Sequence, residues 1–196
     1  MTNEQLEALG INAKWLDPLN NVFDKYDIST PERQSAFIGQ CQHESANFKI
    51  LQENLNYSAQ GLMKTWGSRF PDLETANQYA HNPKKIASKV YVGRMGNLTE
   101  EDAANYTGRG LIQLTGREMY ANCGLGIGVD LLSDPDRLLD PEYAALSAGW
   151  FWNKKGLNDL ADSKDYETMT KRINGGLLGL DDRKAHITKA LEVLTG

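Results

Sequence analysis

Several features that define other classes of protein are scarce or absent in this chain of 196 residues. Its two cysteines, Cys41 and Cys123, are too few for a disulfide framework, so we expect free thiols, with a single bridge left open. The start lacks the basic and apolar segments of a secretory signal, and no apolar run approaches the roughly 18 residues of a membrane span. The net charge of -5, without a cluster of lysines or arginines, gives no support to nucleic-acid binding. We therefore expect a protein that is made and held in a cytoplasm.

The apolar periodicity that the chain does have is helical almost throughout. The clearest helix starts at Pro31, with Thr30 as its N-cap and Glu32 beside the positive helix end. Other helices are expected near Thr2, over 13–26, from Ser58, over 72–79, over 83–94, from Pro141 to a stop at Gly156, over 166–173 and over 181–194. "GLIQLT" (110–115) is the best short strand pattern, and 93–110 reads as a long surface loop. The sequence therefore predicts a mainly α fold in one domain, 1–196.

Two glutamates, Glu44 and Glu53, lie nine positions apart on either side of an expected helix end. On one continuous helix they would face opposite ways, because nine residues turn the chain by about 900°. Asn47 is a common type of helix stop, and the irregular segment after it allows the chain to bring Glu53 back to face Glu44. Glu44 continues the apolar stripe of Phe37, where partial burial disfavours the charged form of a carboxyl group, whereas Glu53 is flanked by amides. One proton donor and one ionised base, held apart, are the minimum for hydrolysing a glycosidic bond.

Each of these residues also has a plainer interpretation. Glu44 and Glu53 are two of 26 acidic residues, and either can be solvated or paired with a cation. "HESAN" begins like a zinc-protease motif, but Asn47 stands at the position of the second histidine, so we expect no metal site. Cys41 and His43 point to different faces of a helix, which favours a buried cysteine over a thiol nucleophile.

The stretch "NYTGRGLIQLTGREMY" (105–120) strengthens the catalytic interpretation. Its glycines leave the backbone open to a chain of sugars. If the stretch is a strand, Gln113 and Thr115 point the same way and can meet sugar N-acetyl groups or an ordered water, while the residues between them face the core. Thr115 also fits a capping box with Glu118 for a helix to Asn122, and the two roles are compatible.

Six blocks of the chain, taken in order, resemble the phage endolysin branch of glycoside hydrolase family 19, the chitinase-like lysozymes. They are "TPERQSAFIGQCQHES", "ENLNYSAQGL", "VYVGRMGN", "GRGLIQLTGREMY", "AGWFWNKKGLNDLAD" and "RINGGLLGLDDR". The resemblance implies a two-lobed, lysozyme-like α fold with a substrate cleft, and an inverting hydrolase of β-1,4-linked N-acetylated aminosugars. We expect a larger lobe of about 1–57 and 106–196 and a smaller lobe of about 58–105. The loop before "GRG" departs from the pattern of many relatives.

The resemblance also assigns roles to individual residues. Glu44 of "HES" matches the general acid of the family, and Glu53 of "ENLNYS" matches the base of the endolysin branch, although the plant chitinases place their base further along the chain. Thr115 matches the residue that positions the attacking water, which makes it the third catalytic candidate. Three further residues match substrate-contacting or cleft positions: Gln113, Asn174 and Arg183, the last beside the carboxyl groups.

Four more residues are candidates for substrate binding on chemical grounds. Tyr57, Tyr106 and Arg109 can line sugar subsites, because flat side chains stack on pyranose rings, but a core or surface role is equally open for each. His43, the neighbour of Glu44, is expected to support the acid through hydrogen bonds rather than to react itself.

Three functions are compatible with these residues. The first is a peptidoglycan-degrading lysozyme (muramidase type) of a phage lysis cassette, which acts on glycan strands as a monomer without a cofactor or stable membrane insertion. It would lie in the host cytoplasm until a separate holin-type pore admits it to the wall. The second is a chitinase of the same family, and the third is a catalytically inactive sugar-binding module. We favour the first, because chitin lies outside cells, and disfavour the third, because Glu44, Glu53, Gln113 and Thr115 are all present.

Overall fold

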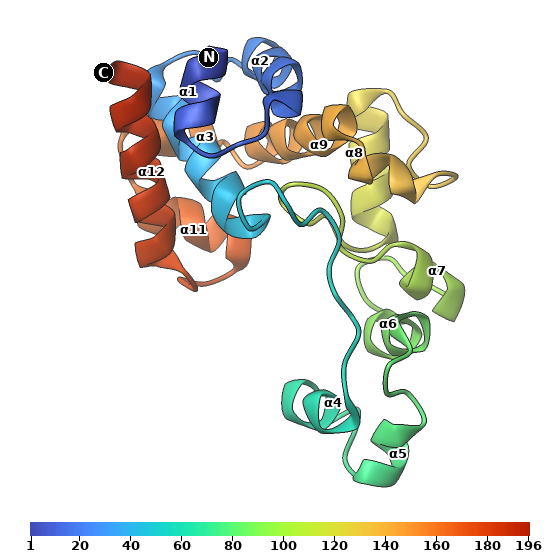
Figure 1. Ribbon diagram of the computed structural model, residues 1–196. Helices are drawn as coiled ribbons and strands as arrows, with labels where there is room; N and C mark the ends of the chain where they lie inside the picture. Colours follow the sequence, from blue (N-terminus) through green and yellow to red (C-terminus); the bar gives the residue numbers. More distant parts are fainter. The chain divides into compact units, whose positions relative to one another are not determined.

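The structure is a computed structural model that describes residues 1–196. The chain is 62% helical with almost no strand, which confirms the mainly α fold class (Figure 1). It divides into two compact units. The first unit comprises Met1–Leu51, Arg109–Gln113 and Asp136–Gly196, and the second comprises Gln52–Gly108 and Leu114–Pro135. That 1–196 forms a single catalytic domain stays a prediction.

The helices of each unit follow the chain in order. The first unit holds α1 (Asn3–Ala8), α2 (Leu16–Lys25), α3 (Pro31–Glu44), α9 (Pro141–Lys154), α10 (Leu157–Asp162), α11 (Tyr166–Asn174) and α12 (Leu180–Thr195), with the short 3-10 helices Ala13–Trp15 and Pro135–Leu139. The second unit holds α4 (Ala59–Thr65), α5 (Leu73–Asn77), α6 (Pro83–Tyr91), α7 (Glu100–Asn105) and α8 (Arg117–Ile127).

Most of the helix starts are fixed by local capping chemistry. The side chain before the helix accepts a hydrogen bond from a first-turn amide at Thr2, Thr30, Ser58, Asp72, Asn82, Thr99 and Asp165. Proline occupies the first turn of α3, α6 and α9, where its missing amide hydrogen costs no bond. These ends are therefore dictated by the sequence itself.

Three expectations for the middle of the chain are wrong. Residues 110–113 form a turn, not a strand, and Gln113 has a φ of 56°. Ile112 and Leu114 are buried while Gln113 and Thr115 are half-buried, as expected, but Leu111 is buried as well. The N-cap of α8 is Gly116, one residue after the expected Thr115, and α8 continues to Ile127, past the expected end at Asn122. The expected loop over 93–110 contains α7.

The grouping of residues 114–135 differs from the expected lobes. We expected them in the larger lobe, but they group with the second unit, and so do 52–57 and 106–108, which we also expected in the larger lobe. The start of α8 explains the grouping of 114–135: Arg117 N–H donates to Asn97 Oδ1 at 2.9 Å, and Glu118 N–H donates to Met95 O at 3.2 Å. The rings of Tyr106 and Tyr120 also pack edge to face at 5.2 Å. These contacts tie α8 to the chain just before it.

In the first unit, α3 and α12 pack side by side (Figure 1). Gly39 makes the close approach possible. A Cβ at this position would lie 2.7 Å from Ile187 N and 2.9 Å from Ile187 Cα. Any larger residue would have to push the two helices apart. The pairing matters because each of these helices supplies a candidate site residue.

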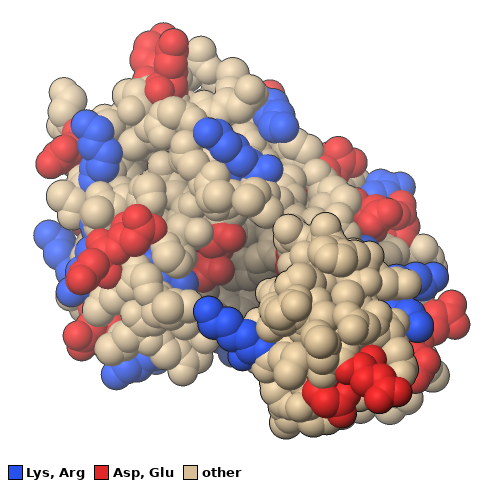
Figure 2. Space-filling view, turned by 60° about the horizontal axis from the view of Figure 1, so that its bottom comes forward, with Lys and Arg blue, Asp and Glu red and all other residues tan.

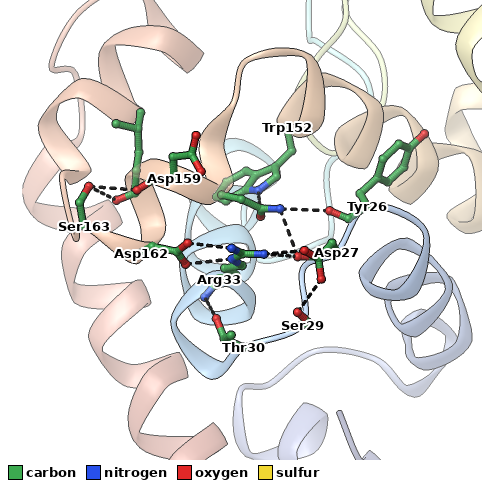
Figure 3. Close-up of polar contacts among 11 residues, drawn as sticks. Tyr26, Asp27, Ser29, Thr30, Arg33, Trp152, Asp159, Asp162 and Ser163 are labelled. Atoms are coloured by element: carbon green, nitrogen blue, oxygen red, sulfur yellow. Dashed lines mark hydrogen bonds and ion pairs between the residues drawn. The ribbon is translucent and has the colours of Figure 1, made fainter.

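A polar network holds the N-terminal end of α3 in place (Figure 3). Arg33 donates to both carboxylate oxygens of Asp162, at 2.9 and 2.7 Å, and to Asp27 Oδ2 at 2.9 Å. Hydrogen bonds from Arg33 lower the pKa of Asp162. The side-chain amide of Asn158 donates to the Tyr26 carbonyl at 3.1 Å and accepts from Trp152 Nε1 at 2.9 Å. The start of α3 is thus fixed to α10, which Asn158 in turn links to Trp152 of α9.

The second unit has an apolar core of its own, formed by Leu55, Ala59, Leu62, Phe70, Ala76, Ile86, Ala87 and Val90.

Across the face drawn in Figure 2, acidic and basic side chains are interspersed, in keeping with 26 acidic and 21 basic residues. None of the helices combines the length and the apolar character that crossing a membrane would require.

Candidate active site

Glu44 is the last residue of α3, and its carboxyl group pairs with Arg183 of α12. The Oε1 atom lies 2.7 Å from Arg183 Nη2. The side chain of Glu44 is 18% exposed, whereas that of Arg183 is 1% exposed. Glu44 therefore remains accessible to a ligand, but it meets a buried guanidinium rather than apolar side chains alone.

Arg183 holds three separate groups of the first unit. Besides Glu44, its guanidinium donates to Gln40 Oε1 at 2.7 Å and to the carbonyl of Leu178 at 3.0 Å. Gln40 is buried as well and donates to Thr170 Oγ1 on α11 at 3.3 Å. Because the arginine is buried and each of its three side-chain nitrogens has a partner, it fixes the rotamer of Glu44.

The chain turns sharply just after Glu44, as the sequence predicts. Ala46, Asn47 and Phe48 all have positive φ, between 47° and 65°. Non-glycine residues seldom adopt this conformation, so local contacts must stabilise it. Ser45 Oγ accepts from the Phe48 amide at 2.8 Å, and the Asn47 amide donates to the Gln42 carbonyl at 2.8 Å. The turn fixes the end of α3 and hence the acid candidate.

The neighbours of Glu44 on α3 have structural contacts. Cys41 is a buried free thiol, and burial together with the charge of Glu44 raises its pKa, which agrees with the buried cysteine favoured from sequence. His43 Nδ1 lies 2.6 Å from Asp182 Oδ2 on α12, and the hydrogen bond with His43 is the main cause that lowers the pKa of Asp182. Gly179 packs so closely on the His43 ring that a Cβ would overlap it.

Glu53 lies in the second unit and is held by two donors. Tyr91 Oη donates to Oε2 at 2.9 Å, and the amide of Gly108 donates to Oε1 at 3.0 Å. The backbone of Glu53 is fixed too, since its own amide donates to the Gly108 carbonyl at 2.9 Å. The segment around Glu53 is irregular up to the N-cap Ser58, as expected. A carboxylate with one donor on each oxygen keeps lone pairs for a further proton.

The "GRG" segment contributes residues to both units. Gln113, in the first unit, is half-buried, and its side chain donates to the Gly110 carbonyl at 3.0 Å. Arg109 is 7% exposed and pairs with Asp136 at 3.1 Å, and its role toward a substrate stays a prediction. Thr115 is half-buried in the second unit.

The remaining candidates differ in exposure. Tyr106 is 6% exposed and its hydroxyl donates to the Leu132 carbonyl at 2.8 Å, so its ring belongs to the core. Tyr57 is half-buried and packs edge to face on Trp66 with centroids 5.0 Å apart. Asn174 is exposed at the end of α11, where Gly175 reverses the chain with a φ of 82°. The roles of these residues toward a substrate stay predictions.

The candidates thus fall into two sets, one in each unit. The first unit brings Glu44, Arg183 and His43 together at the ends of α3 and α12. The second unit joins Glu53 to Gly108. The sequence analysis did not identify Tyr91 as a site residue. Its position in "VYVGRMGN", one of the six blocks that resemble the family, was the signal that could have indicated it. Gln40 was missed as well.

Comparisons with known proteins define the class. The family described as Chitinase class I matches residues 23–161. A "Glycosyl hydrolase family 19 domain-containing protein" of Haemophilus influenzae is 40% identical over 154 residues, 77% of this chain and 74% of that one. Endochitinase A2 of Pisum sativum is 30% identical over 178 residues, 80% of this chain but 49% of its own length. The chain therefore spans about half of that plant enzyme.

Solved structures share the fold. Chitinase C of Streptomyces griseus matches with a TM-score of 0.68 at 17% identity, over 99% of this chain and 92% of that one. At this identity the likeness establishes the fold alone. Fold and sequence together define a glycosidase with the mainly α, lysozyme-like fold. The chain belongs to glycoside hydrolase family 19.

Proposed function

We propose that the protein is a peptidoglycan-degrading lysozyme that hydrolyses β-1,4 bonds between N-acetylated aminosugars with inversion. Glu44 protonates the leaving glycosidic oxygen, while Glu53 removes a proton from the water that attacks the opposite face of the sugar. This mechanism needs the two carboxyl groups roughly 6.5–9.5 Å apart, so that the water fits between them. Thr115 helps to hold the water, and Gln113 and Asn174 bind the sugar.

The observation that carries the catalytic proposal is that each carboxyl group is half-buried and held by dedicated donors. Glu44 is held by Arg183, and Glu53 by Tyr91 and Gly108. Solvent-exposed glutamates on the surface of a helix are free to change rotamer, whereas these two side chains are held in fixed orientations. Positioned carboxyl groups are what general acid and base catalysis requires.

The choice of peptidoglycan rests on the bacterial relative. It is covered over 74% of its length at 40% identity, whereas Endochitinase A2 is covered over 49% at 30%. Peptidoglycan is the polymer that surrounds bacterial cells. The endolysin pattern with its base at Glu53 points the same way. We propose accordingly that the protein accumulates in a host cytoplasm and reaches the wall through a separate pore.

A chitinase is the second candidate, because the matched relatives include plant endochitinases and the structural neighbours include chitinase C. Two assays run in parallel separate the candidates: clearing of outer-membrane-permeabilised bacteria, and release of sugars from colloidal chitin. We expect clearing of the bacteria and muropeptides cut at a glycosidic bond, identified by mass spectrometry. Faster hydrolysis of chitin would replace the proposal with a chitinase. Binding without cleavage of either polymer would indicate an inactive sugar-binding module.

A further inference from the structure

Tyr91 is the closest side-chain partner of Glu53 among the contacts of the second unit. Its hydroxyl donates to Oε2 at 2.9 Å, and Gly108 N–H donates to Oε1 at 3.0 Å. The two donors act on different oxygens, so together they fix the plane of the carboxylate as well as its direction. Without Tyr91, Oε2 would lose this donor and the plane could rotate about the single bond to Gly108.

The position of Tyr91 is itself fixed by the "VYVGRMGN" block. Tyr91 ends α6, and Asn97 Nδ2 donates to its carbonyl at 3.2 Å. Asn97 is 1% exposed and accepts the Arg117 amide on its Oδ1 at 2.9 Å, while its carbonyl accepts from Gly93 N–H at 2.8 Å. One buried asparagine thus connects the end of α6 to the start of α8. A buried amide that is bonded through both its nitrogen and its oxygen gives Tyr91 a defined position.

The chemistry of Tyr91 suits a permanent donor. Burial, and next the charge of Glu53, raises the pKa of its phenol well above the usual value. The charged or titratable groups that also act on it are Tyr57, which raises the pKa, and Arg94, which lowers it. The phenol therefore keeps its proton at any pH at which a lysozyme works. It can donate a hydrogen bond, but it cannot compete with Glu53 as a base.

We propose that Tyr91 is the positioning residue of the catalytic base, and that it acts through Glu53 without touching the substrate. This inference rests on the proposed function, in which Glu53 is the base. In the reaction, the water oxygen forms the new bond to the anomeric carbon while the glycosidic C–O bond breaks. The water proton passes to a free lone pair of Glu53, and Tyr91 keeps its own proton throughout. Its hydroxyl keeps the accepting lone pair aimed at the water.

Tyr91→Phe tests the proposal, because it removes one oxygen and preserves the ring. We expect kcat to fall about 10-fold to 100-fold, the range for losing one hydrogen bond to a charged group. KM should stay unchanged, since no substrate contact is lost. Tyr143→Phe, in the first unit, removes a phenol bonded to Arg137 and serves as the matched control.

Glu53→Gln and the double variant separate this inference from the proposed function. In the Glu53→Gln background, Tyr91→Phe should have no further effect on the residual rate. Thermal unfolding of the four proteins should show the same coupling between the two residues, independently of activity. An active Glu53→Gln protein would overturn the base assignment itself. An inactive Glu53→Gln protein beside a Tyr91→Phe protein with wild-type kcat, or with only KM raised, would overturn the role of Tyr91 alone.

Discussion

Replacing Glu44 by glutamine tests the acid and its ion pair in one variant. The glutamine keeps the size of the side chain and an oxygen that can accept from Arg183, but it has no acidic proton to donate. Arg183 keeps its contacts with Gln40 and Leu178. Exchanging the ion pair of the buried guanidinium for a hydrogen bond to a neutral amide should lower the free energy of unfolding by about 1–2 kcal/mol. In a chain of 196 residues this corresponds to a Tm lower by about 2–8 °C.

Hydrolysis should suffer far more than stability. Removing a general acid lowers the rate about 10²-fold to 10⁴-fold, and a bacterial clearing assay on the purified variant measures this. Glu192→Gln is the matched control: it lies on α12 with a side chain 65% exposed, so activity and Tm should both stay at the wild-type values. A folded Glu44→Gln protein that clears bacteria normally would refute the acid assignment. A variant more stable than the wild type would refute the reasoning on the ion pair.

Three further predictions follow from packing and charge. Gly39→Ala should reduce both stability and the rate of hydrolysis. A methyl group pressed against Ile187 costs about 1–3 kcal/mol, which exceeds the gain of about 1 kcal/mol from the higher helix propensity of alanine. A higher Tm of the variant would contradict this packing. Arg33→Met should lower the free energy of unfolding by about 1 kcal/mol or less. Because the pKa of Asp162 is lowered from 3.8, this loss should be full above pH 3.8 and should shrink below it. A loss of stability that grows on acidification would be inconsistent with the ion pair. Cys41 should resist thiol reagents until the protein unfolds, and rapid labelling of the native protein would show that it is not buried.

The sequence predicted the features that depend on neighbouring residues. Thr30 and Ser58 cap their helices as expected, and the chain turns after Glu44 around Asn47, as expected. Capping and chain reversal are local, because a side chain bonds to an amide only a few positions away. The mainly α fold follows from the same local signals.

Contacts between distant residues were beyond reach of the sequence pattern. Tyr91 and Glu53 are 38 positions apart, and only the packing of α6 brings the phenol to the carboxylate. The apolar pattern of "GLIQLT" fits a strand as well as a buried turn, because short apolar runs do not distinguish the two. Gln113 adopts a left-handed backbone conformation, which glutamine does not favour and which the sequence therefore does not predict. The pairing of Glu44 with Arg183 was anticipated from family resemblance, not from periodicity.

The stereochemistry of hydrolysis tests the central claim most directly. If Glu44 and Glu53 act as acid and base with a water between them, a single displacement converts the β linkage into an α-anomeric product. Proton NMR, recorded in the first minutes of digestion before mutarotation, distinguishes the two anomers. The account predicts that the α-anomer forms first. Initial formation of the β-anomer would mean a covalent intermediate, and this assignment of the two glutamates would then be wrong.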